Sequence, residues 1–309
     1  MPQPERYSAP RMITPLSAPT APVPGRNGLT FPLAPDVLDA LVRSALEEDG
    51  AFNDITTIAT VVTERRARAS LVAKDTGVVA GVPLAVEAFR LLDPKVSIRI
   101  DAEDGTSVNA GDSVLFITGH ARPILAAERV ALNFLQRLSG VASLTARYVE
   151  AVRGTKARIL DTRKTTPGWR LLEKYAVRAG GGTNHRFDLA SAVLIKDNHL
   201  AALDGDIALA VRRSRETAPP GTRVEVECER REQVEAAVRA GADIVMLDNM
   251  PAAELRSCVA LVAGRTTVEA SGGVSLYTVR EIAECGVDWI SVGALTHSAP
   301  AMDLALDFE

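Results

Sequence analysis

Cationic side chains are concentrated in two short stretches near the middle of the chain. Arg163 and Lys164 are adjacent in the segment 161–168, which continues with two threonines and a Pro-Gly turn, and His185 and Arg186 follow three glycines. A guanidinium binds a carboxylate or phosphate through two parallel hydrogen bonds. The first stretch predicts an anion site rather than a solvated loop. The second fits equally a loop that closes on a ligand and a structural histidine.

Lys196 follows directly after the apolar run 192–195. A lysine at the end of a buried strand must reach a partner or solvent, because an unpaired ammonium group is costly to bury. A Schiff-base lysine is one interpretation. A phosphate-binding lysine is the other, and the cations nearby in the sequence favour it.

Acidic residues occupy every second position of the segment 224–229, at Glu225, Glu227 and Glu229. In a strand this spacing places all three on one face. In a parallel sheet covered by helices that face would point into a barrel, where carboxylates need a metal or cationic partners. Asp248 ends the next apolar run, so it should lie beside Glu227. With only oxygen ligands nearby, this pair predicts Mg²⁺ or Mn²⁺.

Glycine-containing turns end the last two apolar runs, with Ser271, Gly272 and Gly273 after one and Gly293 after the other. Glycines expose backbone N–H groups, and a helix that starts nearby adds a partial positive charge, so such turns bind phosphate. Together with the cations and acids they indicate a polyanionic substrate that carries a phosphate and a metal-bound pyrophosphate. The chain has no GxGxxG motif after a first strand and no GxSxG motif, which argues against hydride transfer and a serine hydrolase.

The elements that must position these residues alternate between short apolar runs and amphipathic segments. This alternation predicts a parallel sheet. A closed or nearly closed α/β barrel is favoured over a doubly wound sheet, because a barrel directs the polar residues at all strand ends to one site. Strands are predicted to begin near Arg158, Ala192, Val224, Ile244, Thr267 and Trp289, and helices to span 171–179, 206–217, 231–240, 252–262 and 276–284.

The first half of the chain follows another pattern and is predicted to be α+β. Helices are predicted over 36–49 and 123–152, and strands over 67–80, 96–101 and 114–118. Residues 1–30 contain seven prolines and are interpreted as a mobile extension, with a packed N-terminal arm as the alternative.

Composition limits the functional class. The chain has 309 residues, 47% of them hydrophobic, and a net charge of −4, so two domains with cores are possible and no basic surface for nucleic acid is expected. Three cysteines without a CxxC pair exclude a disulfide framework and fit a reducing compartment. No apolar run reaches the ~18 residues of a membrane span, and no signal peptide is recognisable. A cytoplasmic protein without a membrane partner is expected.

In their order along the chain these motifs resemble the quinolinate phosphoribosyltransferase family, also called nicotinate-nucleotide pyrophosphorylase (carboxylating). The resemblance runs from about residue 30 to 309 and rests on the ordered combination of motifs. The matching segments are 53–57, 128–133, 138–142, 161–168, 180–182, 185–186, 196–199, 224–228, 247–249, 269–273 and 292–297.

The resemblance implies a fold and an assembly. The fold is an incomplete, seven-stranded α/β barrel over 135–297 with an N-terminal open α/β sandwich domain over 31–134, on which residues 298–309 return to pack. The assembly is a homodimer in which the N-terminal domain of one subunit covers the barrel of the other. Arg129 would then act in the partner's site.

The implied reaction converts quinolinate and phosphoribosyl pyrophosphate, with Mg²⁺, into nicotinate mononucleotide, pyrophosphate and CO₂. By resemblance, Arg129, Arg163, His185 and Arg186 hold the quinolinate carboxylates, and Lys164 and Lys196 bind between quinolinate and pyrophosphate. Glu227 and Asp248 hold Mg²⁺ and the ribose hydroxyls, and the 5-phosphate is bound by Ser271, Gly272, Gly273, Gly293 and His297. Lys164, Lys196, Glu227 and Asp248 are the implied catalytic residues.

Other functions remain open. A molybdenum-transport-associated paralogue shares much of this motif set, but the number of cations favours a dicarboxylate substrate. A non-catalytic phosphosugar-binding barrel has less need of the Glu227–Asp248 pair. An aldolase that forms a Schiff base through Lys196 is a third class, which borohydride trapping would reveal.

Overall fold

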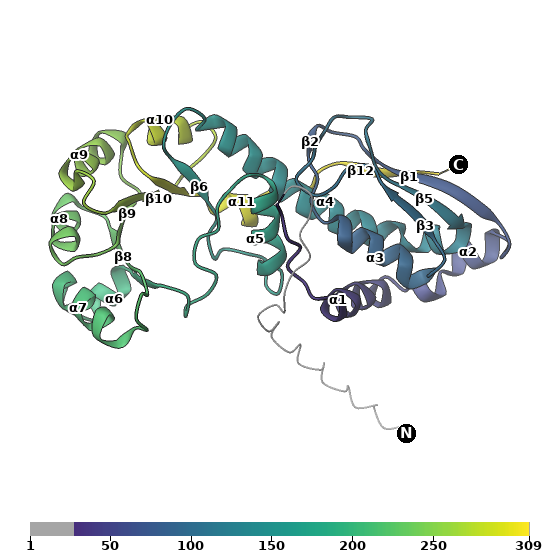
Figure 1. Cartoon of the computed structure of the whole chain (residues 1–309), viewed down its shortest axis with the longest axis horizontal. Helices are drawn as coiled ribbons and strands as arrows, with labels where there is room; N and C mark the ends of the chain where they lie inside the picture. Colours follow the sequence, from purple (N-terminus) through teal and green to yellow (C-terminus); the bar gives the residue numbers. More distant parts are fainter. Residues whose placement is uncertain (1–27, 309) are drawn as a thin grey trace, which may run out of the picture.

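The computed structural model describes residues 28–308, and nearly all of the expected N-terminal extension over 1–30 lies outside this range. The described chain forms two domains that lie side by side and share one long helix (Figure 1). Among residues 28–308, no helix combines the length and apolar character that a membrane span requires.

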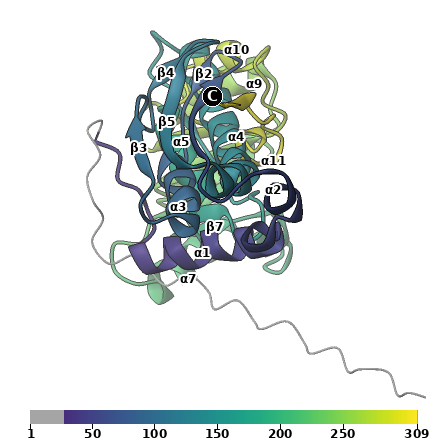
Figure 2. The ribbon, with the colours of Figure 1, turned by 90° about the vertical axis from the view of Figure 1, so that its right-hand side faces the viewer.

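The N-terminal domain is built on a four-stranded antiparallel sheet in the order β12-β1-β5-β3. Its strands are β1 (Arg66–Ala73), β3 (Ser97–Ile100), β5 (Ser113–His120) and β12 (Leu304–Phe308). Burial alternates along the first half of β1, the pattern of a sheet with one face on a core. That core is completed by the helices α1 (Pro35–Glu48), α3 (Val82–Leu92) and α4 (Ala121–Ala151), which lie along the sheet (Figures 1 and 2).

The strand expected over 67–80 is in fact two strands. β1 ends at Ala73, the chain bends, and β2 (Gly77–Val78) pairs with β4 (Ser107–Val108) instead. The bend falls at Lys74-Asp75, a polar pair between two apolar segments. The short segments η1 (Ala51–Asn53) and α2 (Ile55–Thr60) follow α1 on the same domain.

The helix α4 belongs to both domains. It runs without interruption through the expected domain boundary between residues 134 and 135. Gly140 in this helix lets the end of the chain cross closely, since a Cβ there would overlap the carbonyl oxygen of Pro300. After this crossing the chain returns to the first domain as β12 and pairs with β1.

The second domain contains six parallel strands in the order β6-β11-β10-β9-β8-β7. They are β6 (Arg158–Leu160), β7 (Val193–Ile195), β8 (Val224–Cys228), β9 (Ile244–Asp248), β10 (Thr267–Ser271) and β11 (Trp289–Ser291). Beyond β6 a single parallel bridge joins Leu160 to Thr183, which occupies the seventh position of the implied barrel. Within residues 28–308 no pairing joins this bridge to β7, so the barrel is incomplete on that side (Figure 1).

Helices cover the outside of this barrel (Figure 1), as the alternating pattern predicts. They are α5 (Arg170–Ala179), α6 (Asp197–Ala201), α7 (Ile207–Thr217), α8 (Arg231–Arg239), α9 (Ala252–Val262) and α10 (Val279–Glu284). The short α11 (Ala294–His297) follows β11 and contacts α4 and α5. Four of the five residues of β9 are buried, as expected for a strand covered on both faces. Because all six strands are parallel, their carboxyl ends meet at one mouth of the barrel.

Candidate active site

A cavity of about 700 Å³ opens at the carboxyl ends of the barrel strands. Parallel strands place residues that are distant in sequence at this common edge. Within the described chain, every expected site residue except Arg129 lines the cavity: Arg163, Lys164, His185, Arg186, Lys196, Glu227, Asp248, Ser271, Gly272, Gly273, Gly293 and His297.

Two guanidinium groups form one wall. Nε of Arg163 is buried and has no hydrogen-bond partner among residues 28–308. Arg186 donates from Nη1 to the carbonyl oxygen of Ala192 at 3.0 Å, which fixes its position next to β7. Burial and the neighbouring charge of Arg163 lower the pKa of Arg186. Two cations held this close, one with an unused donor, favour an anionic ligand between them.

An ion pair joins the ends of β7 and β8. Nζ of Lys196 lies 2.5 Å from Oε2 of Glu227, and the lysine side chain stays 44% exposed to the cavity and solvent. Asp248, at the end of β9, accepts a hydrogen bond from Nδ2 of Asn249 at 2.7 Å. Glu229 lies beyond the end of β8 and is exposed, so only Glu225 and Glu227 of the acidic stripe face the barrel interior.

Backbone rather than side chains forms the wall at β10 and β11. Gly272 has a φ of +89°, and a Cβ there would overlap the side-chain amide of Asn249, so both conformation and space require glycine. A Cβ on Gly293 would lie 3.2 Å from Cδ of Lys164, which shows that the lysine side chain passes over this glycine. The helix after Gly273 begins only at Val279, so exposed N–H groups rather than a helix terminus characterise that turn.

Comparison with known proteins assigns this arrangement to a family. The N-terminal domain of quinolinate phosphoribosyl transferase matches residues 54–139, and the C-terminal domain of the same family matches residues 141–307. The chain belongs to the quinolinate phosphoribosyltransferase family. The resemblance read from the motifs and the expected fold class are confirmed.

Individual members of the transferase family are similar over most of their length. A Bacillus subtilis protein named probable nicotinate-nucleotide pyrophosphorylase (carboxylating) is 41% identical over 270 residues, which cover 87% of this chain and 93% of that protein. The Mycobacterium leprae nicotinate-nucleotide pyrophosphorylase (carboxylating) is 43% identical over 274 residues, or 86% and 95% of the two chains. The crystal structure of NadC from Streptococcus pyogenes is 43% identical, covers 90% of this chain and 98% of that chain, and superposes with a TM-score of 0.85.

Arg129 stands apart from the other expected residues of the transferase site. It is exposed on α4, in the part of that helix that belongs to the N-terminal domain, and within the described chain it does not line the cavity. Its implied role in a partner subunit therefore stays a prediction.

A buried ion pair beneath the cavity escapes the sequence reasoning. Nζ of Lys174, on α5, lies 2.5 Å from Oδ1 of Asp161, and the two side chains are only 4% and 0% exposed. Burial raises the pKa of Asp161 and lowers that of Lys174, while the charge of each partner opposes the other's shift. Asn184 also donates to Asp161, at 2.6 Å. The pair thus fastens the end of β6 to α5 and to the loop before His185.

Glu173, next to Lys174, holds the loop that carries Arg163 and Lys164. Glu173 is fully buried and accepts hydrogen bonds from Arg137 at 2.6 Å and from the backbone N–H of Thr166 at 3.0 Å. Thr296 donates to the carbonyl oxygen of Lys164 at 2.8 Å. The loop that carries Arg163 and Lys164 is therefore held from both sides. In the helical pattern Glu173 and Lys174 lie away from the face of Leu172, Tyr175 and Ala176, so the sequence gives no local signal for their burial.

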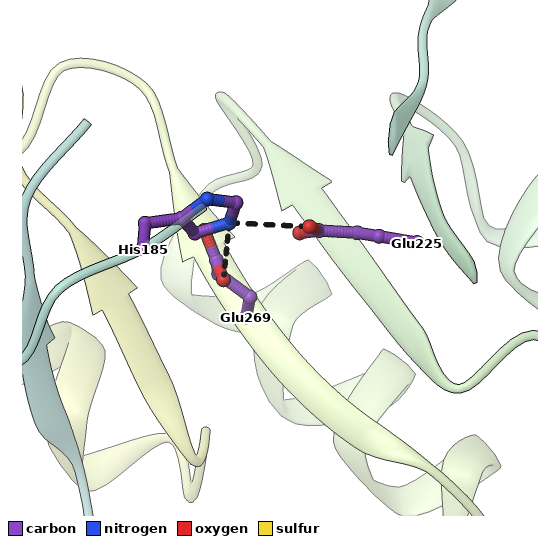
Figure 3. A group of neighbouring side chains, drawn as sticks. All are labelled: His185, Glu225 and Glu269. Carbon is purple, nitrogen blue, oxygen red and sulfur yellow. Dashed lines mark ion pairs between the residues drawn. The ribbon is translucent and has the colours of Figure 1, made fainter. Parts of the chain in front are cut away.

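Both ring nitrogens of His185 have partners inside the protein. Nε2 lies 3.1 Å from Oε2 of Glu225 and 3.5 Å from Oε2 of Glu269 (Figure 3). Nδ1 accepts from the backbone N–H of Arg186 at 2.8 Å. Burial opposes a charge on the ring, but the hydrogen bonds and charges of the two glutamates outweigh it and raise the pKa of His185. The ring of His185 is thus the partner of Glu225 inside the barrel.

Proposed function

We propose that this chain transfers the phosphoribosyl group of phosphoribosyl pyrophosphate to quinolinate with release of CO₂, giving nicotinate mononucleotide and pyrophosphate for NAD biosynthesis. The names of its relatives support this reaction. The observation that supports this reaction for this chain is the cavity itself, which combines a wall of two arginines with an acidic pair and two glycine turns.

The cations have the number and spacing for a dicarboxylate next to a polyphosphate. Arg163 and Arg186 bind the two carboxylates of quinolinate, with His185 part of the same wall. Lys164 and Lys196 line the same cavity, where they offset the repulsion between quinolinate and pyrophosphate. The backbone of the glycine turns, with Ser271 and His297, binds the 5-phosphate.

The chemistry requires positioning and charge stabilisation. The ring nitrogen of quinolinate attacks the anomeric carbon while pyrophosphate leaves, and positive charge develops on the sugar. Carboxylates at Glu227 and Asp248 stabilise that charge. The pyridinium formed is an electron sink, so the adjacent carboxylate leaves as CO₂ without a nucleophile from the protein. Binding both substrates in line accounts for most of the acceleration.

The acidic pair fits Mg²⁺. Glu227 and Asp248 end adjacent strands and both line the cavity, and carboxylate oxygens are ligands that this ion prefers. Lys196 neutralises Glu227 in the structure, so this lysine would turn toward the pyrophosphate when the ion is bound. The ion would supply Lewis-acid neutralisation of the pyrophosphate charge.

A homodimer with Arg129 acting in the partner's site is part of the proposal. An apolar surface lies on the N-terminal domain at Phe52, Ile55, Ile58 and Val62, which are 49%, 74%, 48% and 67% exposed. Arg122 fastens this surface to α4 by donating to the carbonyl oxygens of Ile58 and Val61. Arg129 follows two helical turns later on the same face. An apolar patch beside an exposed arginine suits a surface that a second copy covers.

Mixing two inactive variants tests the shared site. Arg129→Ala and Arg163→Ala dimers, dissociated and reassociated together, should regain about a quarter of the wild-type activity, because half of the dimers are mixed and each has one intact site. Each variant mixed with itself is the control. No recovery from a verified mixed dimer would contradict action in trans.

The reaction is tested by following nicotinate mononucleotide by its ultraviolet absorbance in purified protein with quinolinate, phosphoribosyl pyrophosphate and Mg²⁺. Nicotinate replaces quinolinate in the parallel assay. Product from quinolinate alone is expected. Absence of product from either would leave the fold intact and favour the transport-associated paralogue or a phosphosugar-binding role.

A further inference from the structure

Both the backbone and the ring of His185, the residue before Arg186, are bonded to buried polar groups. The backbone N–H of His185 donates to Oδ1 of Asp161 at 2.9 Å, and its carbonyl oxygen accepts from Nζ of Lys174 at 3.0 Å. The ring is held from the opposite direction, by Glu225 on β8 and Glu269 on β10 (Figure 3). One loop residue thus contacts charged groups from two barrel strands, the end of a third, and α5.

The two glutamates are interior residues. Glu225 is 2% exposed and Glu269 is 0% exposed, and Glu269 also accepts a hydrogen bond from the hydroxyl of Ser291 on β11. One oxygen of each carboxylate has no hydrogen-bond partner among the described residues, apart from the 3.5 Å approach of His185 to Glu269. Buried carboxylates are costly, and apolar residues of the same volume would pack a barrel interior equally well. Their presence therefore needs a reason other than stability.

We propose that Glu225 and Glu269 are positioning residues for quinolinate binding: they hold the ring of His185 inside the barrel, and the ring fixes the backbone of Arg186 so that its guanidinium faces the cavity. The inference rests on the proposed function for the identity of the ligand. The link is the hydrogen bond from the N–H of Arg186 to Nδ1 of His185. If the ring turns, this bond breaks and the backbone of Arg186 loses its anchor, while the bond from Nη1 to the carbonyl oxygen of Ala192 remains.

The protons of the cluster agree with this arrangement. An Nδ1 that accepts from a backbone N–H carries no proton, so the ring donates from Nε2 to the glutamates. Burial raises the pKa of Glu225, so the two carboxylates attract one further proton. That proton is shared within the cluster of the ring and the two glutamates. Arg186, and Arg163 beside it, place positive charge next to Glu225 and so disfavour a metal ion among these three side chains.

The test compares Glu225→Gln and Glu269→Gln with the control Glu229→Gln, which changes an exposed residue just beyond the end of β8. Each buried variant should raise the KM for quinolinate about tenfold or more, because a small displacement of a binding group weakens binding strongly. The KM for phosphoribosyl pyrophosphate should stay within about twofold of the wild-type value. The control should change neither. Equal rises in both KM values would show a general structural defect and overturn the proposal.

A double-mutant cycle separates positioning from an independent effect. If Glu225 acts through Arg186, Glu225→Gln should add almost nothing to the rise in quinolinate KM caused by Arg186→Ala. Multiplication of the two effects would contradict the inference. Should either glutamine variant fail to fold, Ser291→Ala removes only the hydroxyl bonded to Glu269 and should give a smaller shift in the same direction.

Hydrogen exchange examines the same network without substrate, so it distinguishes a failure of this inference from a failure of the proposed function. Amides in the peptide 183–188 should exchange faster in Glu225→Gln and Glu269→Gln than in the wild type, because the bond to Nδ1 loosens. Peptides over 252–262 on α9 serve as the internal reference. Unchanged exchange at 183–188 would overturn the positioning role.

Discussion

The two walls of the cavity recognise anions in different ways. The wall at 161–186 uses side chains, and each is fixed by further buried charges: Asp161 with Lys174, Glu173 with Arg137, and His185 with its two glutamates. The wall at 271–273 and 293 uses backbone, and glycines with their close neighbours define its shape. Long side chains lose rotamer freedom when they are ordered and need supports. Backbone donors are already fixed by the strands that end there.

If this contrast holds, the largest loss of stability follows from removing a support of the side-chain wall. Lys174→Met leaves Asp161 buried without its cation, so the free energy of unfolding should fall by about 3–5 kcal/mol. Denaturant unfolding measures this. A loss below about 1 kcal/mol would show that the ion pair is dispensable.

The next largest effect is expected from a cation that binds substrate directly. Arg163→Ala should lower kcat/KM for quinolinate by an amount that corresponds to a loss of about 2–4 kcal/mol of transition-state stabilisation, the scale of a lost charged contact in a site. The free energy of unfolding should change little. The KM for phosphoribosyl pyrophosphate should change little, because the other wall is intact. Steady-state kinetics with each substrate varied in turn is the measurement, and near-normal activity would remove Arg163 from the site.

The backbone wall should respond to a single added methyl group. In Gly272→Ala the side chain would overlap Asn249 and the left-handed conformation would be strained, at a cost of about 1–3 kcal/mol. The KM for phosphoribosyl pyrophosphate should rise and that for quinolinate should not. Gly221→Ala is the matched control, since its φ is +84° but the space around it is open. An equal rise in both KM values would contradict the separation of the two walls.

The smallest effect is expected for a charge pair away from both walls. Lys156 lies 2.6 Å from Asp288, and the side chains are 57% and 34% exposed. Lys156→Met should change the free energy of unfolding by less than about 1 kcal/mol, because solvent screens the pair. Compared with Lys174→Met in the same denaturant series, it isolates the effect of burial. Equal losses in the two variants would mean that burial is not what distinguishes them.

Several elements could be read from the sequence for simple physical reasons. Strands of a parallel barrel are buried on both faces, so they appear as short apolar runs, and all six expected runs form the sheet. The polar residue after each run lies at the cavity because parallel strands end at one edge. In contrast, the single bridge at Thr183 carries no strand pattern, and β12 is recognisable only through its pairing with β1. The bend at Asp75 could not be predicted, because apolar residues on both sides of it continue the pattern of one strand.

The sequence by itself determined which residues could bind anions, since residue type and position after an apolar run are local properties. It also required that Glu225 and Glu227 have cationic partners or a metal, because buried carboxylates cannot stay unpaired. Only the tertiary structure decided the partners, His185 for one and Lys196 for the other. The physical reason is that charge pairing acts through space. The groups that meet inside the barrel come from strands and loops separated along the chain, and no local pattern records which of them meet.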